Sequence, residues 1–167
     1  MSARPAIAIV LPPRERFRAG DAGAVALTVR DFVLASRWRE HITVWGGEPE
    51  HFADVAYRQV PPRLHWLLGR NVAYGLACAA AVRAADPALI EVHNRIGLAL
   101  KLKAGFPERR VTLHLHNDPH GMGGGQTVAE RRRLIASLDT LYCVSGYVRD
   151  RLLDGLTDVD ASHVQVI

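Results

Sequence analysis

The segment His114-Leu115-His116-Asn117-Asp118-Pro119-His120 places three imidazoles and a carboxylate close together in the chain. Side chains alternate along a strand, so His114 and His116 are expected on the same face at the end of a short apolar strand. Pro119 cannot donate to a strand ladder and predicts that the chain turns away there. Two kinds of chemistry suit such a segment: a metal centre, or a polar pocket that holds a sugar or a phosphate.

The spacing of these residues argues against a metal. A His-x-His pair on a strand supplies half of a zinc site. Hydrolases of the metallo-β-lactamase type use His-x-His-x-Asp-His, with the last histidine directly after the aspartate, whereas Pro119 separates Asp118 from His120 here. We therefore expect no metal. A metal-dependent hydrolase that uses His114, His116, Asp118 and His120 remains an alternative, as does a non-catalytic nucleotide- or phosphosugar-binding module.

The composition is that of one globular domain. The chain has 167 residues, of which 49% are hydrophobic and 23% charged, a balance typical of a soluble core. The longest apolar helix-like run, 72–82, is shorter than the ~20 residues of a membrane span and is expected to form a buried helix. No signal peptide is evident, which favours a cytoplasmic location. Cys78 and Cys143 lie in apolar surroundings and are expected to be unpaired core residues.

The basic residues are almost all arginines, and the formal net charge is +4. They cluster at 14–18 and 131–133, and arginine suits planar contacts with phosphate or carboxylate groups. A solvated helix face is the simpler interpretation of 131–133. The few aromatic residues are not interleaved with the basic ones, so we expect no nucleic-acid partner.

Short aliphatic runs alternate with longer amphipathic or Ala-rich segments along the whole chain. This pattern predicts an α/β fold: a Rossmann-like, doubly wound parallel sheet in a three-layer α/β/α arrangement with about six to seven strands. Ser145 is expected to cap the last helix. Strands are predicted at 7–11, 41–45, 54–58, 89–93, 111–116, 140–144 and 164–167, and helices at 22–38, 63–85, 97–104, 127–138 and 145–153.

In an open parallel sheet, ligands bind beyond the carboxyl ends of the strands, where loops and helix N-termini gather. Two glycines after the first predicted strand would let the backbone approach a ligand and direct helix amides at an anion. The other candidates follow the strands at 89–93, 111–116 and 140–144. The residues expected along this edge are Gly20, Gly23, Asn94, Arg95, His116, Asn117, Asp118 and Ser145.

Four segments in this order resemble the N-terminal, acceptor-side domain of a family 4 glycosyltransferase of the GT-B type: 7–23, His93-Asn94-Arg95, 113–118 and 141–150. The resemblance covers nearly the whole chain. It implies a single Rossmann-like domain over 1–167 that forms the N-terminal half of a two-domain, retaining, hexosyltransferase-type enzyme, whose C-terminal donor-binding domain is absent from this chain. It further implies that the chain alone does not turn over. No metal or other cofactor is implied, because the nucleotide-sugar is a substrate.

The resemblance also implies roles for individual residues. His116 resembles the family's cleft histidine near the transferred sugar and the donor phosphate, with a near-neutral pKa that allows either protonation state. The loop with Gly20 and Gly23 resembles the one that approaches the donor phosphate, although it departs from the commoner double-glycine loop by having Asp21-Ala22 between its glycines. The residues implied to bind the acceptor side are Asn94, Arg95, Asn117 and Asp118, with Ser145 at the same edge and the glycine run 121–125 as a mobile flap.

The partners implied are a nucleotide-sugar donor, a carbohydrate or lipid-linked acceptor, and the missing C-terminal domain. An arginine surface near the acceptor would suit peripheral contact with a membrane, at the inner face of the cell membrane. Polysaccharide, lipopolysaccharide or glycolipid biosynthesis is the usual setting of such enzymes.

Overall fold

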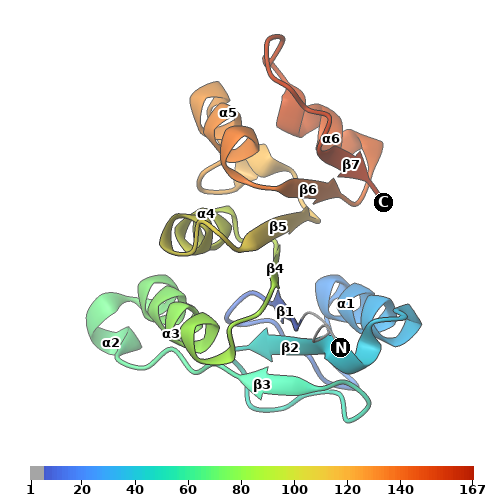
Figure 1. Ribbon diagram of the computed structural model, residues 1–167, viewed down its shortest axis with the longest axis vertical. Coiled ribbons are helices and arrows are strands. Elements are labelled where there is room, and N and C mark those ends of the chain that lie inside the picture. The colour runs from blue at the N-terminus through green and yellow to red at the C-terminus, as the bar shows by residue number, and fades with distance from the viewer. Residues whose placement is uncertain (1–5) are drawn as a thin grey trace. The chain divides into compact units, whose positions relative to one another are not determined.

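The computed structural model describes residues 6–167 and contains two compact units, the first ending at Ile90 and the second beginning at Glu91 (Figure 1). Helices alternate with seven strands, as the sequence predicts. The elements are β1 (Ile7–Val10), α1 (Ala24–Ala35), η1 (Arg39–His41), β2 (Ile42–Gly46), β3 (Tyr57–Gln59), α2 (His65–Leu68), α3 (Arg70–Ala85), β4 (Leu89–His93), α4 (Ile96–Gly105), β5 (Arg110–Leu115), η2 (Pro119–Gly121), α5 (Val128–Ser137), β6 (Thr140–Cys143), α6 (Gly146–Leu153) and β7 (Val164–Val166).

The strands belong to a parallel, seven-stranded sheet of the Rossmann-like α/β class. In the first unit the order is β3-β2-β1, followed by the start of β4. Strand β1 pairs in parallel with β2, with Ile9 opposite Val44, and β2 pairs in parallel with β3. In the second unit the end of β4 is followed by β5, β6 and β7, and the pairs β5–β6 and β6–β7 are parallel. The predicted fold class is confirmed.

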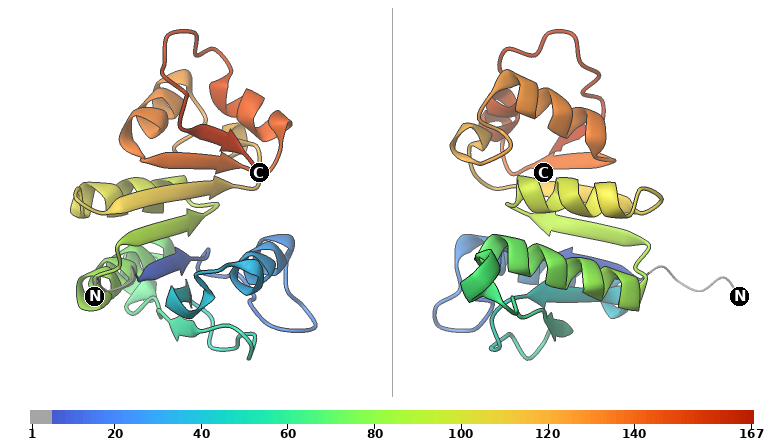
Figure 2. Two further views of the ribbon diagram at one scale, coloured as in Figure 1. Left: turned by 45° about the vertical axis from the view of Figure 1, so that its right-hand side comes forward. Right: turned by 90° about the vertical axis from the view of Figure 1, so that its left-hand side faces the viewer.

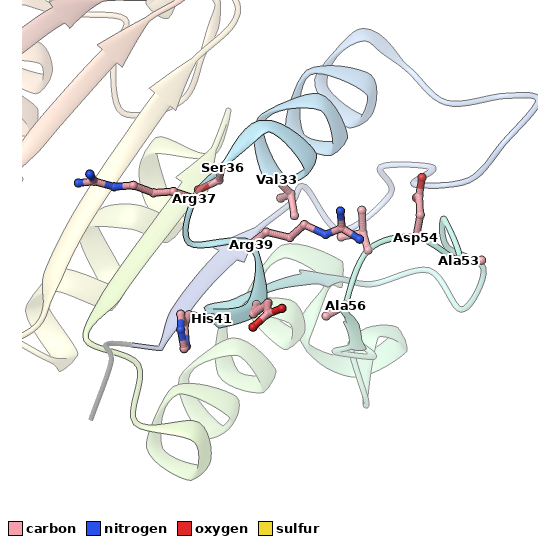
Figure 3. Close-up of a pocket in the computed structure, with 10 residues that line it drawn as sticks. Val33, Ser36, Arg37, Arg39, His41, Ala53, Asp54 and Ala56 are labelled. Atoms are coloured by element: carbon pink, nitrogen blue, oxygen red, sulfur yellow. The ribbon is translucent and has the colours of Figure 1, made fainter. Parts of the chain in front are cut away.

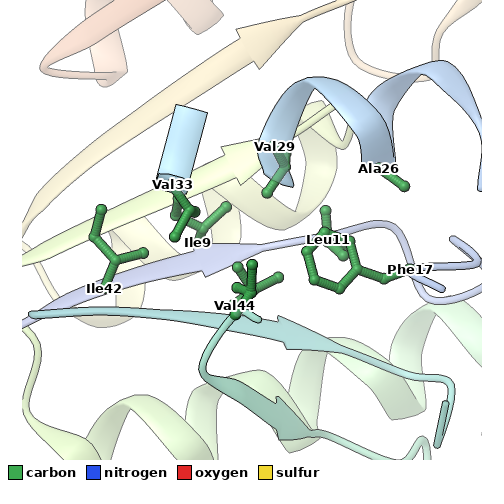
Figure 4. Packing of buried hydrophobic residues seen from close by; sticks show 9 residues of the cluster. Ile9, Leu11, Phe17, Ala26, Val29, Val33, Ile42 and Val44 are labelled. Carbon is green, nitrogen blue, oxygen red and sulfur yellow. The ribbon is translucent and has the colours of Figure 1, made fainter. Parts of the chain in front are cut away.

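The first unit has its core between α1 and the sheet (Figure 4). Ile9 of β1 and Leu11, directly after this strand, face Val29 and Val33 of α1, with Val44 of β2 beside them. Burying an aliphatic side chain of this size contributes ~1.5–3 kcal/mol. Helix α3 lies on the opposite side of these strands from α1, so this unit has three layers (Figures 1 and 2).

The helix predicted over 63–85 is two helices. Gly69 lies between α2 and α3 with φ of +77°, a conformation that interrupts the helix and that glycine adopts without strain. Tyr74 is fully buried, and its hydroxyl donates to the Leu11 carbonyl at 2.9 Å. Leu76, by contrast, is 58% exposed. The prediction of a buried helix at 72–82 is therefore wrong for one side of α3.

The second unit is held by helix caps as well as by its strands. Thr127 and Glu130 form a reciprocal capping box at the start of α5. Ser145 Oγ accepts from the Val148 amide at 3.3 Å and caps α6, as predicted. Helix α4 packs on β5, and α6 contacts η2, β6 and β7.

The third strand begins later than predicted, at Tyr57 instead of Asp54. Asp54 forms an ion pair with Arg30 of α1, and Val55 is buried in the core. These contacts hold residues 54 and 55 in a loop that packs on α1. Pairing with β2 begins at Ala56, whose carbonyl accepts the Val44 amide at 2.9 Å.

Cys78 and Cys143 are both buried and free, as expected. Burial raises the pKa of the Cys78 thiol to about 12 and that of Cys143 to about 11. Both are therefore protonated at neutral pH and act as small core side chains. Within residues 6–167, no helix combines the length and the apolar character needed to cross a membrane.

Candidate functional site

A cluster of one carboxylate and three imidazoles lies on one face of β4 and β5 in the second unit. Glu91 and His93 alternate along β4, and His114 and His116 alternate along β5 and its carboxyl end, so each pair shares a face. The ring of His93 contacts both His114, at a centroid distance of 4.5 Å, and His116, at 5.2 Å. The expectation that His114 and His116 point to the same side is confirmed.

Hydrogen bonds link three of these side chains in series, from Glu91 through His93 to His116. Glu91 Oε1 lies 2.9 Å from His93 Nε2, and His93 Nδ1 lies 2.9 Å from His116 Nε2. The other carboxylate oxygen of Glu91 lies 3.5 Å from His114 Nε2. Glu91 is therefore the common acceptor for two imidazoles, and His93 links it to His116.

The electrostatics follow from burial. Burial alone would raise the pKa of Glu91, but hydrogen bonds from His114 and His93 outweigh it and hold that pKa well below its usual range. His93 is fully buried, and the loss of solvation lowers its pKa. Burial likewise lowers the pKa of His116 to about 4. The expected near-neutral pKa of His116 is therefore wrong, and its imidazole is neutral at pH 7.

Three members of the cluster are of the types that hold a transition metal. Ligand atoms of Glu91, His93 and His114 all lie within 4.8 Å of one another, and carboxylate oxygen and imidazole nitrogen are common zinc ligands. These same atoms are hydrogen-bonded or ion-paired to one another in the structure. This set differs from the four residues that the sequence offered for a metal.

Asp118 and His120, the rest of that sequence-derived set, are turned toward α6. Arg151 Nε donates to Asp118 Oδ2 at 2.9 Å, and the other oxygen of Asp118 accepts the His120 amide at 2.9 Å. His120 Nε2 donates to the Arg151 carbonyl at 2.8 Å, and its Nδ1 accepts from the Arg151 guanidinium at 2.7 Å. The structure thus does not bring Asp118 and His120 to the imidazoles of His114 and His116. Asn117, between the two groups, is exposed.

Asn94 and Arg95 follow β4 directly. Asn94 has φ of +55°, and its Oδ1 accepts the His116 amide at 3.1 Å, so it fixes the backbone at the end of β5. Arg95 stands at the N-terminus of α4, and its Nε is buried without a hydrogen-bond partner among residues 6–167. An unpaired buried N–H is costly, and this one has almost no exposed surface. The structure brings Asn94 and His116 together as predicted. The hydroxyl of Ser145, after β6, is engaged in capping.

In the glycine-containing loop of the first unit, the carboxylate of Glu15 occupies the space in front of the N-terminus of α1. Gly20 is exposed with φ of +94°, and Gly23 precedes α1. Glu15 Oε1 accepts the Ala26 amide at 3.2 Å, and a Cβ at Gly23 would lie 2.9 Å from that same oxygen. The helix amide that we expected to face a ligand anion therefore faces Glu15, which stabilises the N-terminus of α1 in the place of such an anion.

Neither arginine cluster forms a free basic patch. Arg18 forms a two-pronged pair with Asp21, at 2.7 and 2.8 Å, and also contacts Glu50. Arg16 pairs with the same Asp21 at 3.2 Å. Arg131 is buried and donates to four main-chain carbonyls, so the interpretation of 131–133 as one solvated face is wrong for it. Charge spacing along a helix cannot reveal that one member turns inward.

The end of the glycine run 121–125 is packed. Gly125 is buried, and an added Cβ would lie 2.9 Å from Ile96 Cδ1 and 2.7 Å from the Pro119 carbonyl oxygen. Gly124, with φ of +91°, lies against Ile96 as well. This close packing argues against a mobile flap at 124–125.

A hollow of about 700 Å³ in the first unit lies at the amino ends of β2 and β3 (Figure 3). Ligands of parallel sheets bind at the opposite edge, beyond the carboxyl ends. We therefore do not regard this hollow as the functional site. Its lining is Val33, Ser36, Arg37, Arg39, Glu40, His41, Ala53, Asp54, Val55 and Ala56.

Sequence reasoning placed His93 at the same sheet edge as His116, but it missed Glu91 and the hydrogen bonds that join the three side chains. The signal was present: Glu91-Val92-His93 puts two polar residues at alternate positions of a strand that was correctly predicted over 89–93. In an apolar strand, such a pair on one face indicates a buried polar network.

No protein-family model and no curated protein matches this sequence. Its fold is similar to that of a lipopolysaccharide outer core galactosyltransferase, WaaB, in its apo form, with a TM-score of 0.64, 10% identity, and coverage of 95% of this chain and 44% of that one. It is also similar to a UDP-N-acetylglucosamine 2-epimerase, with a TM-score of 0.58, 11% identity, and coverage of 96% and 47%. A putative UDP-N-acetylglucosamine 2-epimerase from Listeria monocytogenes is also similar, with a TM-score of 0.56, 10% identity, and coverage of 96% of this chain and 44% of that one.

The chain thus spans less than half the length of each of these proteins. At such low identity the similarity shows the fold alone, a Rossmann-like α/β domain.

Proposed function

We propose that this chain is the N-terminal, acceptor-side domain of a retaining glycosyltransferase, which moves a sugar from a nucleotide-sugar to a glycan, glycolipid or similar acceptor. The observation that carries the proposal is His116. It is partly exposed at the carboxyl end of β5, its ring is hydrogen-bonded to His93, and its amide donates to Asn94. The fold, shared with a galactosyltransferase and with nucleotide-sugar epimerases, supports the same class of substrate.

In this proposal His116 contacts the reacting sugars, since it is the partly exposed end of a buried polar chain. Arg95, at the N-terminus of α4, supplies a guanidinium group for a sugar or phosphate oxygen. The remaining candidates for substrate contact are Gly20, Gly23, Asn94, Asn117, Asp118 and Ser145.

The proposed enzyme uses a nucleotide-sugar as substrate and needs no metal. Its donor-binding C-terminal domain is a separate part of a longer protein, and the chain by itself is inactive. The chain's length relative to its structural neighbours supports this division. Nucleic acid is not a partner in this proposal.

We further propose that the protein acts at the cytoplasmic face of a membrane and contacts it through α2 and the start of α3. This surface carries large exposed apolar side chains, of which Trp66 is 76% and Leu67 65% exposed. Residues 59–85 include three arginines and no acidic residue. Exposed tryptophan and leucine beside arginine suit the interface of an anionic bilayer. This surface replaces the arginine clusters as the candidate, because Arg16 and Arg18 are paired with carboxylates and Arg131 is buried.

The experiment is a transfer assay on the product of the whole reading frame that contains this chain. Nucleotide-sugars are offered with glycolipid extracts, and sugar incorporation is measured for wild type, His116→Ala and His163→Ala. His163 donates to the Ile135 carbonyl at 2.9 Å and has no part in the cluster, which makes it the matched control. We expect His116→Ala to reduce transfer about tenfold or more, as loss of a positioned catalytic contact does, with folding still cooperative.

Wild-type rates in His116→Ala would show that His116 is structural. Binding of nucleotide or phosphosugar without any transfer by the whole protein would favour the binding module. Stoichiometric metal in the purified protein, together with hydrolytic activity, would favour the hydrolase.

A further inference from the structure

The hydrogen-bonded series from Glu91 through His93 to His116 has a geometry that determines which atom of each link carries the proton. Both links are 2.9 Å long, within the range of a full hydrogen bond. Each link needs one proton, and each neutral imidazole carries only one N–H. The position of every proton in the chain therefore follows once one end is known.

Glu91 is that end. An ionised carboxylate only accepts hydrogen bonds, so the Glu91–His93 link requires a proton on His93 Nε2. His93 is fully buried, which disfavours the charged imidazolium form. Neutral His93 then has no proton on Nδ1, so this atom must accept from His116 Nε2.

We propose that Glu91 and His93 are positioning residues that hold His116 as the Nε2–H tautomer, with an unprotonated Nδ1 directed to the ligand. No group of the second unit hydrogen-bonds to His116 Nδ1, and this atom is not among the buried polar atoms without a partner. It is thus accessible as a hydrogen-bond acceptor.

This assignment restricts what His116 can bind. A neutral imidazole that offers a lone pair accepts a proton or a hydrogen bond from a hydroxyl group, and it cannot donate from that atom to a phosphate oxygen. Within the proposed function, on which this step rests, His116 therefore contacts a sugar hydroxyl and leaves the donor phosphate to other groups. The resemblance had allowed either contact.

A metal bound by the neighbouring cluster would reverse the direction of the hydrogen bond between His93 and His116. If His93 bound an ion through Nε2, its remaining proton would lie on Nδ1 and would be donated to His116 Nε2. His116 would then carry its own proton on Nδ1. The tautomer of His116 thus distinguishes the hydrogen-bonded chain from a metal centre formed by Glu91, His93 and His114.

The test is nitrogen NMR of the 167-residue chain labelled with ¹⁵N-histidine, which reads the tautomer of each imidazole from its long-range proton couplings. The variants His93→Gln and His116→Gln assign the two rings. His163 serves as an internal standard for the Nε2–H form, because its Nε2 donates to a carbonyl. At pH 7 with a chelator present, we expect the Nε2–H pattern for both His93 and His116.

Two perturbations complete the test. Glu91→Gln offers an amide that is able to donate as well as accept, so the Nδ1–H fraction of His116 should rise while His163 does not change. In wild type, added Zn²⁺ should leave the His116 pattern unchanged. If Glu91→Gln does not fold, the wild-type tautomer and the Zn²⁺ titration decide the question.

An Nδ1–H pattern for His116 in metal-free wild type, a His116 tautomer indifferent to Glu91→Gln, or a Zn²⁺-induced reversal at stoichiometric metal would overturn the proposal. These outcomes are independent of the proposed transferase activity. A whole protein without transfer, but with the expected tautomers, would reject only the proposed function and the hydroxyl contact that depends on it.

Discussion

Arg131 provides a direct test of how the second unit is held together. Its guanidinium donates to the carbonyls of Gly125 and Gln126, each at 3.1 Å, and to those of Leu152 and Asp154, at 3.2 and 2.7 Å. The first two carbonyls precede α5 and the last two lie at the C-terminus of α6, where helix carbonyls lack partners of their own. One buried side chain therefore links the segment before α5 to the end of α6 through hydrogen bonds.

Arg131→Ala leaves these carbonyls without their donor. A hydrogen bond to a charged group contributes ~1.5–3 kcal/mol, but four bonds from one side chain do not add, and waters will replace those near the surface. Because the partners left behind are neutral carbonyls, we expect a total loss of about 1.5–3 kcal/mol. Arg131→Lys should lose less, because it keeps the charge but not the planar fork.

The neighbouring arginines are matched controls. Arg132 pairs with Asp158 on an exposed surface at 2.8 Å, and such pairs contribute ~0–1 kcal/mol. Arg133 is exposed, so its replacement by alanine should change stability by less than ~0.5 kcal/mol.

The assay is urea unfolding followed by far-UV circular dichroism. The three tryptophans, at positions 38, 45 and 66, all lie in the first unit, so their fluorescence reports mainly on that unit. Arg131→Ala should lower the dichroism midpoint with an unchanged slope. A loss below ~1 kcal/mol, or one no larger than that of Arg132→Ala, would refute the conclusion that the four carbonyl contacts are structural.

Two further predictions concern pH and the membrane surface. Because burial lowers the folded-state pKa of His116 from 6.5 to about 4, the unfolded chain binds more protons between these values, and stability that is present above pH 6.5 is lost as pH falls. Between pH 7.5 and 5, wild type should lose ~1–2 kcal/mol more than His116→Gln in urea unfolding, and equal losses would contradict the lowered pKa. For the membrane surface, Leu67→Glu should weaken sedimentation with anionic vesicles by about tenfold, because it removes apolar burial and adds like charge. Leu27→Glu, at an exposed leucine of α1, should have no such effect, and equal binding by both variants would exclude α2 as the contact.

The sequence was sufficient for the order of the elements. Strand β4 lies at the predicted residues, and Ser145 caps α6 as predicted, because strand alternation and capping are local properties. The helix break at Gly69 was not foreseen, since an isolated glycine is tolerated within a helical pattern.

The sequence by itself determined that His114 and His116 share a face and that Asn94 lies at the same edge, because parallel strands end together. Tertiary structure alone decided which groups meet the imidazoles: Glu91 and His93 reach them across the sheet, whereas Asp118 and His120 turn to Arg151. It also decided that Arg131 is buried and that Glu15 faces the first amides of α1. Periodicity depends on neighbours along the chain, whereas the protonation, pairing and burial of a polar group depend on residues brought beside it by folding.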